Sequence, residues 1–432
     1  MTNRINPEFY DKYNLKRGLR NENGTGVKVG LTQVSSVVGY ELQAGVKHPV
    51  EGNLFYRGIG IRELVEGFSR RQGRGFEETV YLLVFGVLPT ARELREFNEL
   101  LDSMRKLPEN FTENMILKIP SKDVMNKLQR SVLVLYSRDP DPDNLSVKNL
   151  LVQSLSLIAR FPTIISYGFQ AKAHYFDDKS LYIHSPLKGI GTAENILHMI
   201  RPDNGYTPAE AEILDLCLVL HADHGGGNNS AFATHVVSSS GTDTYSAIAA
   251  AVGCLKGPKH GGANIKVALM VEDIKEHCDY RDASALKAYL KKILRGEAFD
   301  AKGLIYGMGH AVYTKSDVRA QILKEKALKL AVEKGRLEEF ELYAAIETLT
   351  REIFFDEKGP EAFIPANVDL YSGLVYSMLG IPRELFTPIF AAARVAGWCA
   401  HRMEQLFSDE KIIRPAYQSV AVQKIYTDIE GR

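Results

Sequence analysis

The sequence has few cysteines and no arrangement of them that would bind zinc or staple a fold. Its 432 residues include four cysteines, none in a CxxC pair: Cys217, Cys254, Cys278 and Cys399. Zinc ribbons and disulfide frameworks both need characteristic cysteine spacings, so neither is expected here. We therefore expect reduced thiols in a reducing compartment.

The chain also lacks an excess of charge and a long apolar run. Lys plus Arg and Asp plus Glu both number 53, so the formal net charge is zero, which argues against a nucleic-acid or acidic-membrane partner. There is no run of 18 or more apolar residues, so we expect no transmembrane helix. The N-terminal stretch is polar and contains Glu8 and Asp11, unlike a signal peptide. These absences predict a cytoplasmic protein.

What is present reads mainly as helix. Thr90 and Glu93 form a capping box before an apolar periodic segment, and the segment 207–210 (TPAE) repeats that signal with proline at the first helical position. A further helix is expected from Thr387 to about Glu404. Strand signals are scarce, and the best candidate is a small hairpin within 27–40. The pattern predicts an all-α protein. If the chain forms two domains, we expect them to share elements and to meet at a cleft.

Four glycine-containing polar segments interrupt the helical pattern. They are LHADHGGGNNS (220–230), GPKHGGANIKVALM (257–270), GMGHAVYTKSDVR (307–319) and PANVDLYSG (365–373). A histidine or aspartate beside glycine in one such segment is ordinarily a cap or a core residue. Four in one chain favour a functional site.

Three residues in these segments suit acid–base chemistry. His260 precedes an expected helix near Gly262, whose positive end disfavours imidazolium, and a neutral imidazole can donate to a carbonyl during enolisation. His310 lies between glycines that allow close approach of a ligand. Asp369 precedes an expected helix over 370–379, where it is either a cap or a general base.

Arginines supply a second indication. Arg394 interrupts an otherwise apolar helix. Either it is a structural arginine, whose side chain reaches water or forms an ion pair, or it binds a substrate carboxylate with both guanidinium nitrogens. Arg319 follows His310 by nine residues, whereas Arg414 is by itself an ordinary loop arginine.

The motifs GPKHGGAN, GMGHAVY…DVR and NVDLYSG, with HADH before them and AARVAGWCAH after them, resemble the citrate synthase family. The match spans about 220–414, and YRGIGIREL (56–64) resembles the family's N-terminal signature more weakly. The resemblance implies a nearly all-helical subunit with two domains. Residues 1–261 and 384–432 would form the large domain and 262–383 the small one, with the active site in the cleft between them.

The family condenses oxaloacetate with acetyl-CoA to give citrate and CoA, through an enol and a citryl thioester, without a metal or a separate cofactor. By resemblance, Asp369 is the general base, His260 hydrogen-bonds the thioester oxygen, and His310 polarises and protonates the oxaloacetate carbonyl. His224 is a further oxaloacetate contact.

The resemblance also assigns the arginines. Arg319 and Arg394 would hold oxaloacetate carboxylates, and Arg414 would reach the site from the partner subunit of a homodimer. The resemblance therefore implies oxaloacetate and acetyl-CoA as substrates and a second copy of the chain as partner.

Several positions depart from common family patterns. They are Gly225 for Glu, Ala311 for Arg, Thr314 for a basic residue and Val318 for Pro. The acid–base residues are unaffected, but contacts to the CoA phosphates and the acyl preference stay open, with Lys315 or Lys256 as candidate replacement charges. Propionyl-CoA, giving 2-methylcitrate, is the alternative substrate, because one methyl group changes binding by only about 1–3 kcal/mol.

Two interpretations outside the citrate synthase family are also open: a metal-dependent hydrolase and a helical scaffold without catalysis. HADH places His221 and His224 around Asp223, with His235 downstream, and such a cluster in a helical protein would suit a metal-dependent phosphohydrolase. His221 has no assigned role in the synthase interpretation. A non-catalytic helical scaffold would tolerate replacement of His260 and Asp369.

Overall fold

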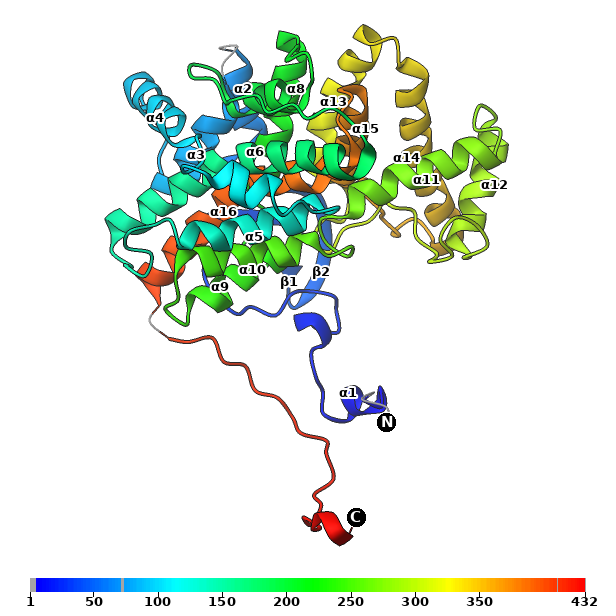
Figure 1. Cartoon of the computed structure of the whole chain (residues 1–432). Helices are drawn as coiled ribbons and strands as arrows, with labels where there is room; N and C mark the ends of the chain where they lie inside the picture. The colour runs from blue at the N-terminus through cyan, green and yellow to red at the C-terminus, as the bar shows by residue number, and fades with distance from the viewer. Residues whose placement is uncertain (1–4, 71–73, 410, 432) are drawn as a thin grey trace.

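The computed structural model describes residues 5–70, 74–409 and 411–431, most of which are helical (Figure 1). The α-helices are α1 (Glu8–Lys12), α2 (Ile61–Arg70), α3 (Gly75–Phe85), α4 (Ala91–Met104), α5 (Val124–Tyr136), α6 (Val147–Asp177), α7 (Thr192–Ile200), α8 (Pro208–His221), α9 (Asn229–Ser238), α10 (Thr244–Lys256), α11 (Ala263–His277), α12 (Ala283–Leu294), α13 (Val318–Glu333), α14 (Leu337–Lys358), α15 (Val368–Met378) and α16 (Phe386–Ser408). Short 3₁₀ or π turns lie at Arg17–Leu19, Thr112–Leu117, Arg383–Leu385 and Ile429–Gly431. The predicted all-α class is confirmed.

Helix starts follow the capping signals in the sequence. Thr90 Oγ accepts the amide N–H of Glu93, whose carboxylate accepts the amide N–H of Thr90 at 2.7 Å. Thr207 and Glu210 form the same box, with Pro208 opening α8. These bonds satisfy amide groups that a helix cannot pair internally, which is why local sequence fixes both starts.

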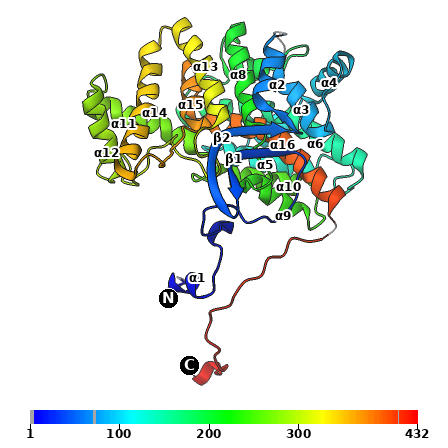
Figure 2. The same cartoon turned by 180° about the vertical axis from the view of Figure 1, so that it is seen from behind.

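A three-stranded sheet stands against the helical body (Figure 2). Strand β1 (Ser35–Gln43) pairs antiparallel with β2 (Val46–Tyr56), which pairs with β3 (Ile59–Gly60). The two-residue turn has left-handed conformations at Ala44 (φ 50°) and Gly45 (φ 82°), as tight hairpins require. The predicted hairpin exists, but its position within 27–40 was wrong, because the pairing begins at Ser35 and extends to Tyr56.

The hydrophobic core is built around α16, which packs against α3, α6, α8, α9 and α10. Its Trp398 is completely buried. Among the described residues, α6 is long and apolar enough to cross a membrane, but 78% of its most apolar window is buried inside the protein. That burial is typical of a core helix of a globular protein. All four cysteines are free thiols.

Helices α11, α12 and α14 lie together at one side of the molecule, beside α13 and α15 (Figures 1 and 2). They fall within the segment 262–383 that was predicted to form a small domain. The division into two domains stays a prediction. After α16 the chain leaves the helical body as an extended segment that ends far from it (Figure 1).

Candidate active site

The segments that carry His310 and Asp369 are joined through their backbones. The N–H of Gly309 donates to Pro365 O at 2.7 Å, and the N–H of Asn367 donates to Gly307 O at 2.8 Å. Gly307 has a φ of 83°, and a Cβ there would lie 2.9 Å from Leu370 Cβ, so this crossing requires glycine. These contacts place the candidate acid and base on adjoining segments.

Hydrogen bonds fix the tautomer of His310. The amides of Val312 and Tyr313 donate to its Nδ1 at 3.0 and 3.1 Å, so Nδ1 is an acceptor and the proton of the neutral ring lies on Nε2. Burial, and after it the charge of Arg319, lower the pKa of His310 to about 4. His310 is therefore neutral at neutral pH and presents a single N–H donor, at Nε2.

His224 lies beside His310, with 5.0 Å between ring centroids. Its Nε2 is buried and has no hydrogen-bond partner within the described residues. Burial, followed by the charge of Arg319, holds the pKa of His224 well below its ordinary value. A substrate oxygen would supply the missing partner.

His260 is held by a serine that sequence reasoning missed. Its Nε2 lies 3.0 Å from Ser230 Oγ, which also accepts the indole N–H of Trp398 at 3.0 Å. The pKa of His260 falls to about 4, first through burial and then through the charge of Arg394. The ring is neutral, as expected, but burial is the larger cause rather than the start of α11.

Asp369 lies in the first turn of α15 and does not cap it. Asn367 is the cap, since its Oδ1 accepts the amide N–H of Asp369 at 3.0 Å. Asp369 Oδ1 is buried without a hydrogen-bond partner among the described residues. Burial raises the pKa of Asp369 to about 6, against the lowering effects of Arg319 and Arg394. A carboxylate in this state suits a general base.

Arg319 and Arg394 are both buried near these groups. Arg319 binds the carboxylate of Asp317 through Nε at 3.1 Å and Nη2 at 2.8 Å. Arg394 donates from Nε to His221 O at 2.6 Å, whereas its Nη1 has no hydrogen-bond partner within the described residues. Burial lowers the pKa of Arg394 to about 10, so it is charged at neutral pH. An unpaired guanidinium nitrogen offers a place for a substrate carboxylate.

Arg394 and His260 flank one aromatic ring. The guanidinium carbon of Arg394 lies 4.6 Å from the centroid of Phe390, and the ring of His260 lies 6.4 Å from it. The structure thus brings together His260, His310, Asp369, His224, Arg319 and Arg394. Arg414 is not among them, because it is exposed in the segment that follows α16.

The HADH motif does not form the ligand set that a metal phosphohydrolase would need. His221 Nδ1 bonds Cys217 O at 2.7 Å, whereas His224 faces His310. His235 instead lies with His401 and Glu404, and their ligand atoms are all within 4.8 Å of one another. The predicted alternative cluster is therefore divided between two places.

The departures from the family pattern have structural reasons at two positions. Gly225 has a φ of 85°, which a residue with a side chain rarely adopts. Thr314 Oγ donates to Gly39 O, so it anchors its loop to β1. Lys256 is paired with Asp123 at 3.0 Å, and Lys315 lies over the ring of Phe363.

These groups define a class of enzyme. A buried base, neutral imidazole donors and two buried arginines suit removal of a proton next to a carbonyl in the presence of a carboxylate substrate. The family model described as the citrate synthase C-terminal domain matches residues 21–416. The chain therefore belongs to the citrate synthase family, whose members are acyltransferases that form a carbon–carbon bond.

Individual relatives and a solved structure are similar to this chain over most of its length and support the same family. The chain is 36% identical to citrate synthase of Deinococcus radiodurans, over 88% of this chain and 93% of that one. It is 33% identical to 2-methylcitrate synthase 1 of Corynebacterium glutamicum, over 87% and 92%. The structure matches Thermoplasma acidophilum citrate synthase in complex with carboxymethyl coenzyme A and oxaloacetate at a TM-score of 0.77, with 26% identity and 96% and 99% coverage.

Proposed function

We propose that this protein condenses oxaloacetate with acetyl-CoA and water to give citrate and CoA. The observation that carries the proposal is the buried carboxyl group of Asp369, which lacks a hydrogen-bond partner at Oδ1 within the described residues and has a pKa near 6. It belongs to one cluster with neutral imidazoles and buried arginines. A structural carboxylate at a helix start would have been satisfied by the helix amides, as Asn367 is.

In the first step, Asp369 takes a proton from the methyl group of the thioester. This methyl group is a very weak acid, so the enol oxygen needs a donor while the carbon–hydrogen bond breaks. His260 provides that donor from Nδ1 when Ser230 donates to its Nε2, a tautomer that the 3.0 Å contact allows. His260 gives its Nδ1 proton to that oxygen, so the products of this step are the neutral enol, protonated Asp369 and a deprotonated His260 ring.

In the second step, the enol carbon attacks the ketone carbon of oxaloacetate. His310 gives its Nε2 proton to the oxygen of that ketone, and the enol proton returns to His260, so the product is citryl-CoA. His224 Nε2 and Arg394 Nη1, which have no hydrogen-bond partner within the described residues, bind oxaloacetate. Arg319, whose Nε and Nη2 hold Asp317, adds its positive charge. Water then cleaves the thioester, with its hydroxyl going to the acyl carbon and a proton to the CoA sulfur, which releases citrate and CoA. The proton held by Asp369 returns to His310, so both groups regain their starting states.

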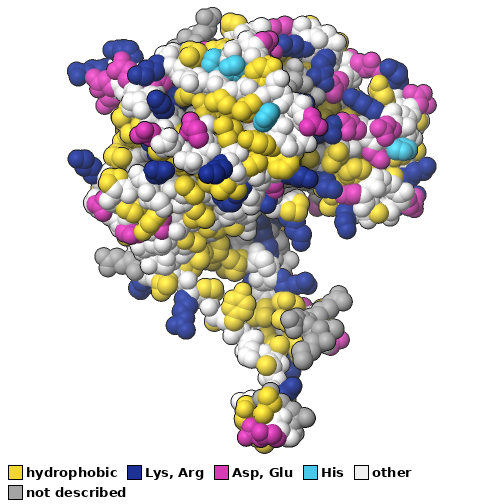
Figure 3. All heavy atoms as spheres, in the orientation of Figure 1, with side chains coloured by type: hydrophobic (Ala, Val, Ile, Leu, Met, Phe, Trp, Pro, Cys, Tyr) yellow, Lys and Arg dark blue, Asp and Glu magenta, His cyan; other side chains and the backbone are white. Residues whose placement is uncertain are grey.

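We also propose a homodimer in which Arg414 enters the site of the partner subunit. Arg414 is exposed on an extended segment that lies away from its own site. Hydrophobic side chains gather on the face crossed by α5 and α6 (Figure 3). Exposed apolar residues on these helices include Leu133 and Val152, at 47% and 46% exposure. An apolar face of this kind suits a symmetric contact between copies.

The remaining features of the proposal concern closure, cofactors and location. The segment 262–383 would close over the substrates as a small domain and exclude water until citryl-CoA has formed. Arginines and imidazoles supply the charge stabilisation, so the proposed steps use no metal and no cofactor beyond the CoA substrate. The free thiols fit a cytoplasmic location.

A second candidate, 2-methylcitrate synthase, has specific support. The chain is 33% identical to 2-methylcitrate synthase 1 of C. glutamicum and 32% identical to 2-methylcitrate synthase of Shewanella oneidensis. These identities are only slightly lower than that of the D. radiodurans citrate synthase. The same residues would act on propionyl-CoA.

The deciding experiment follows CoA release with a thiol reagent in chelator-treated buffer. Oxaloacetate is paired with acetyl-CoA or propionyl-CoA, using the wild type, Asp369→Asn and the exposed control Asp178→Asn. We expect oxaloacetate-dependent release that favours acetyl-CoA, is lost in D369N and is unchanged in D178N. Preference for propionyl-CoA would establish the second candidate, and no release with either thioester from folded protein would reject both.

A further inference from the structure

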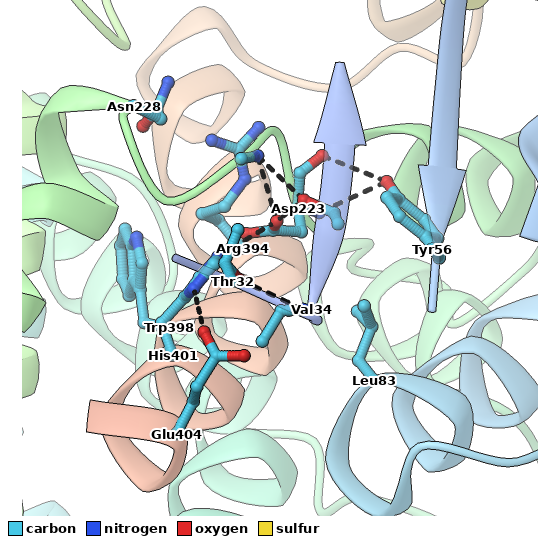
Figure 4. Close-up of polar contacts among 12 residues, drawn as sticks. Thr32, Val34, Tyr56, Leu83, Asp223, Asn228, Arg394, Trp398, His401 and Glu404 are labelled. Carbon is cyan, nitrogen blue, oxygen red and sulfur yellow. Dashed lines mark hydrogen bonds and ion pairs between the residues drawn. The ribbon is translucent and has the colours of Figure 1, made fainter. Parts of the chain in front are cut away.

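A buried ionic network lies behind the candidate site and takes no part in the steps above. At its centre, Asp223 is completely buried and precedes His224 in the chain. Its Oδ2 lies 3.2 Å from His401 Nε2, accepts the amide N–H of Gly225 at 3.0 Å, and also accepts the hydroxyl of Ser35. Figure 4 shows Asp223 between Tyr56 and Arg394, with His401 leading on toward Glu404.

Both nitrogens of His401 have partners. Nε2 faces Asp223, and Nδ1 lies 3.2 Å from His235 Nε2, whose ring is bonded at Nδ1 to Gln405 Oε1 at 2.9 Å. Gln405 Oε1 can only accept, so His235 carries its proton on Nδ1 and accepts at Nε2. His401 therefore donates from both nitrogens, which makes it an imidazolium. The carboxylates of Asp223 and Glu404 raise the pKa of His401 to about 9.

The surrounding charges are consistent with this state. Glu404 Oε2 lies 3.8 Å from His401 Nδ1, and Glu404 Oε1 accepts the amide N–H of Gln33 at 2.6 Å. Arg394 and Arg57 both act electrostatically on Asp223. The positive charge of His401 holds the pKa of Asp223 well below its ordinary range.

The same network forms hydrogen bonds with the backbone on either side of His224. Tyr56 OH contacts both the carbonyl and the amide of Asp223, at 3.1 and 3.2 Å. The N–H of Gly397 donates to Ala222 O at 3.2 Å, and Arg394 donates to His221 O. Hydrogen bonds from α16, β1 and β2 thus hold the residues on both sides of His224. His224 Nε2 has no hydrogen-bond partner within the described residues and is left for a ligand.

We propose that the His401–Asp223 pair, with Ser35, is a positioning device that fixes His224 and Arg394 for binding oxaloacetate. This inference rests on the proposed function and deepens it. His401 touches no substrate atom in this scheme, so it is a positioning residue rather than a catalytic one. The expected consequence is specific: loss of the pair weakens oxaloacetate recognition more than recognition of the CoA thioester.

The side chains of His235, His401 and Glu404 are close enough together to suggest a metal site instead. The contacts favour the ionic network, since His235 Nε2 and His401 Nδ1 lie within hydrogen-bond distance of each other and Glu404 Oε2 is 3.8 Å from His401 Nδ1, as in an ion pair. Metal analysis of the purified protein separates the two. Stoichiometric zinc that is lost in His401→Gln would overturn the proposal.

The test uses variants of graded severity in the full-length protein. His401→Gln and Asp223→Asn each remove one charge, whereas Ser35→Ala removes only a hydroxyl and leaves no buried unpaired ion. Ser166→Ala is the matched control, because Ser166 is a buried serine on α6 outside the network. For each protein, KM for oxaloacetate, KM for acetyl-CoA, kcat and Tm are measured.

We expect H401Q and D223N to raise KM for oxaloacetate about 10-fold or more, and S35A to raise it several-fold, with much smaller changes for acetyl-CoA. Displacing a binding group by about 1 Å can lower catalytic efficiency by roughly 100-fold, so changes of this size are measurable. S166A should match the wild type in both KM values.

The outcomes are distinguishable from failure of the proposed function. A wild type without oxaloacetate-dependent turnover rejects the function itself. An active wild type, with variants whose Tm falls while both KM values stay unchanged, rejects the positioning role and leaves only a structural one. If H401Q and D223N do not fold, S35A decides: an unchanged KM for oxaloacetate overturns the proposal.

Discussion

The state of single ionisable side chains determines when this site can act. In the proposed mechanism, Asp369 must be ionised to accept a proton, and burial raises its pKa to about 6. His260 and His310 have pKa values near 4 and are therefore already neutral above pH 5. Between pH 5 and 7, one group should control the rate.

We therefore expect kcat/KM for acetyl-CoA to rise about tenfold per pH unit below pH 6 and to level off above it, because the active form is the unprotonated one. The measurement is a pH profile of CoA release at low thioester concentration. A profile that is flat from pH 5 to 7 would contradict Asp369 as a base with a raised pKa. H174Q, at an exposed histidine, should retain the wild-type profile.

Arg394 depends on the shape of its side chain as well as on its charge. Its Nε is used by His221 O, and its Nη1 is left for a ligand, an arrangement that lysine cannot copy with one nitrogen. Arg394→Lys should raise KM for oxaloacetate by roughly 10- to 100-fold, the range of a lost charge-assisted hydrogen bond. Arg92→Lys, on the exposed face of α4, is the control and should change neither KM. Equal KM values in R394K and wild type would refute carboxylate binding by the guanidinium.

The residues proposed to carry the chemistry could be predicted from the sequence, whereas the residues that hold them in place could not. His260, His310 and Asp369 stand in glycine-containing segments that break the helical period, so a pattern marks them. Ser230 ends one of these segments, but nothing in the sequence pairs it with His260, and that contact arises only because α9 brings Ser230 within 3.0 Å of His260. The role of His401 likewise depends on α16 passing Asp223, a contact between positions 178 residues apart.

At the scale of elements, the hairpin of β1 and β2 braces the loop that follows His310. A Cβ on Gly39 would lie 2.6 Å from Val312 O and 2.9 Å from Tyr313 N, and these are backbone atoms that cannot rotate away. Gly39→Ala should therefore displace the loop, lower kcat and reduce the free energy of unfolding by about 1–3 kcal/mol.

Gly30→Ala is the matched control for this prediction, because no atom lies within 4 Å of the Cβ position at Gly30. Its effect on the free energy of unfolding should stay within about 0.5 kcal/mol. Denaturant unfolding and CoA release give the two readouts. If G39A and G30A behave alike, the hairpin does not brace the loop.

A helix or strand could be predicted from the sequence where its limits depend on residues close together in the chain. The starts of α4 and α8 were predictable because a capping box uses residues three positions apart. The limits of the hairpin were not, because β1 and β2 contain polar residues on both faces, and their register is fixed by contact with the 312–316 loop. Tertiary contact overrides the local signal there.

At the scale of the whole molecule, the proposed site needs two chains. Arg414 is exposed and belongs to a segment that leaves the body after α16, so a single chain does not bring it to Asp369. In a two-fold dimer, each segment would reach across to the other subunit. Complementation between defective chains tests this directly.

The pair to combine is Asp369→Asn and Arg414→Gln, each expected to be nearly inactive alone. A hybrid dimer would hold one site with both defects and one site with an intact Asp369 and an Arg414 donated by the D369N chain. Co-expression should therefore restore activity through that one complete site. If Arg414 served its own subunit, neither site of the hybrid would be complete and no activity would return. Hybrids isolated with two different affinity tags provide the measurement, and tagged wild-type dimers provide the reference for two intact sites.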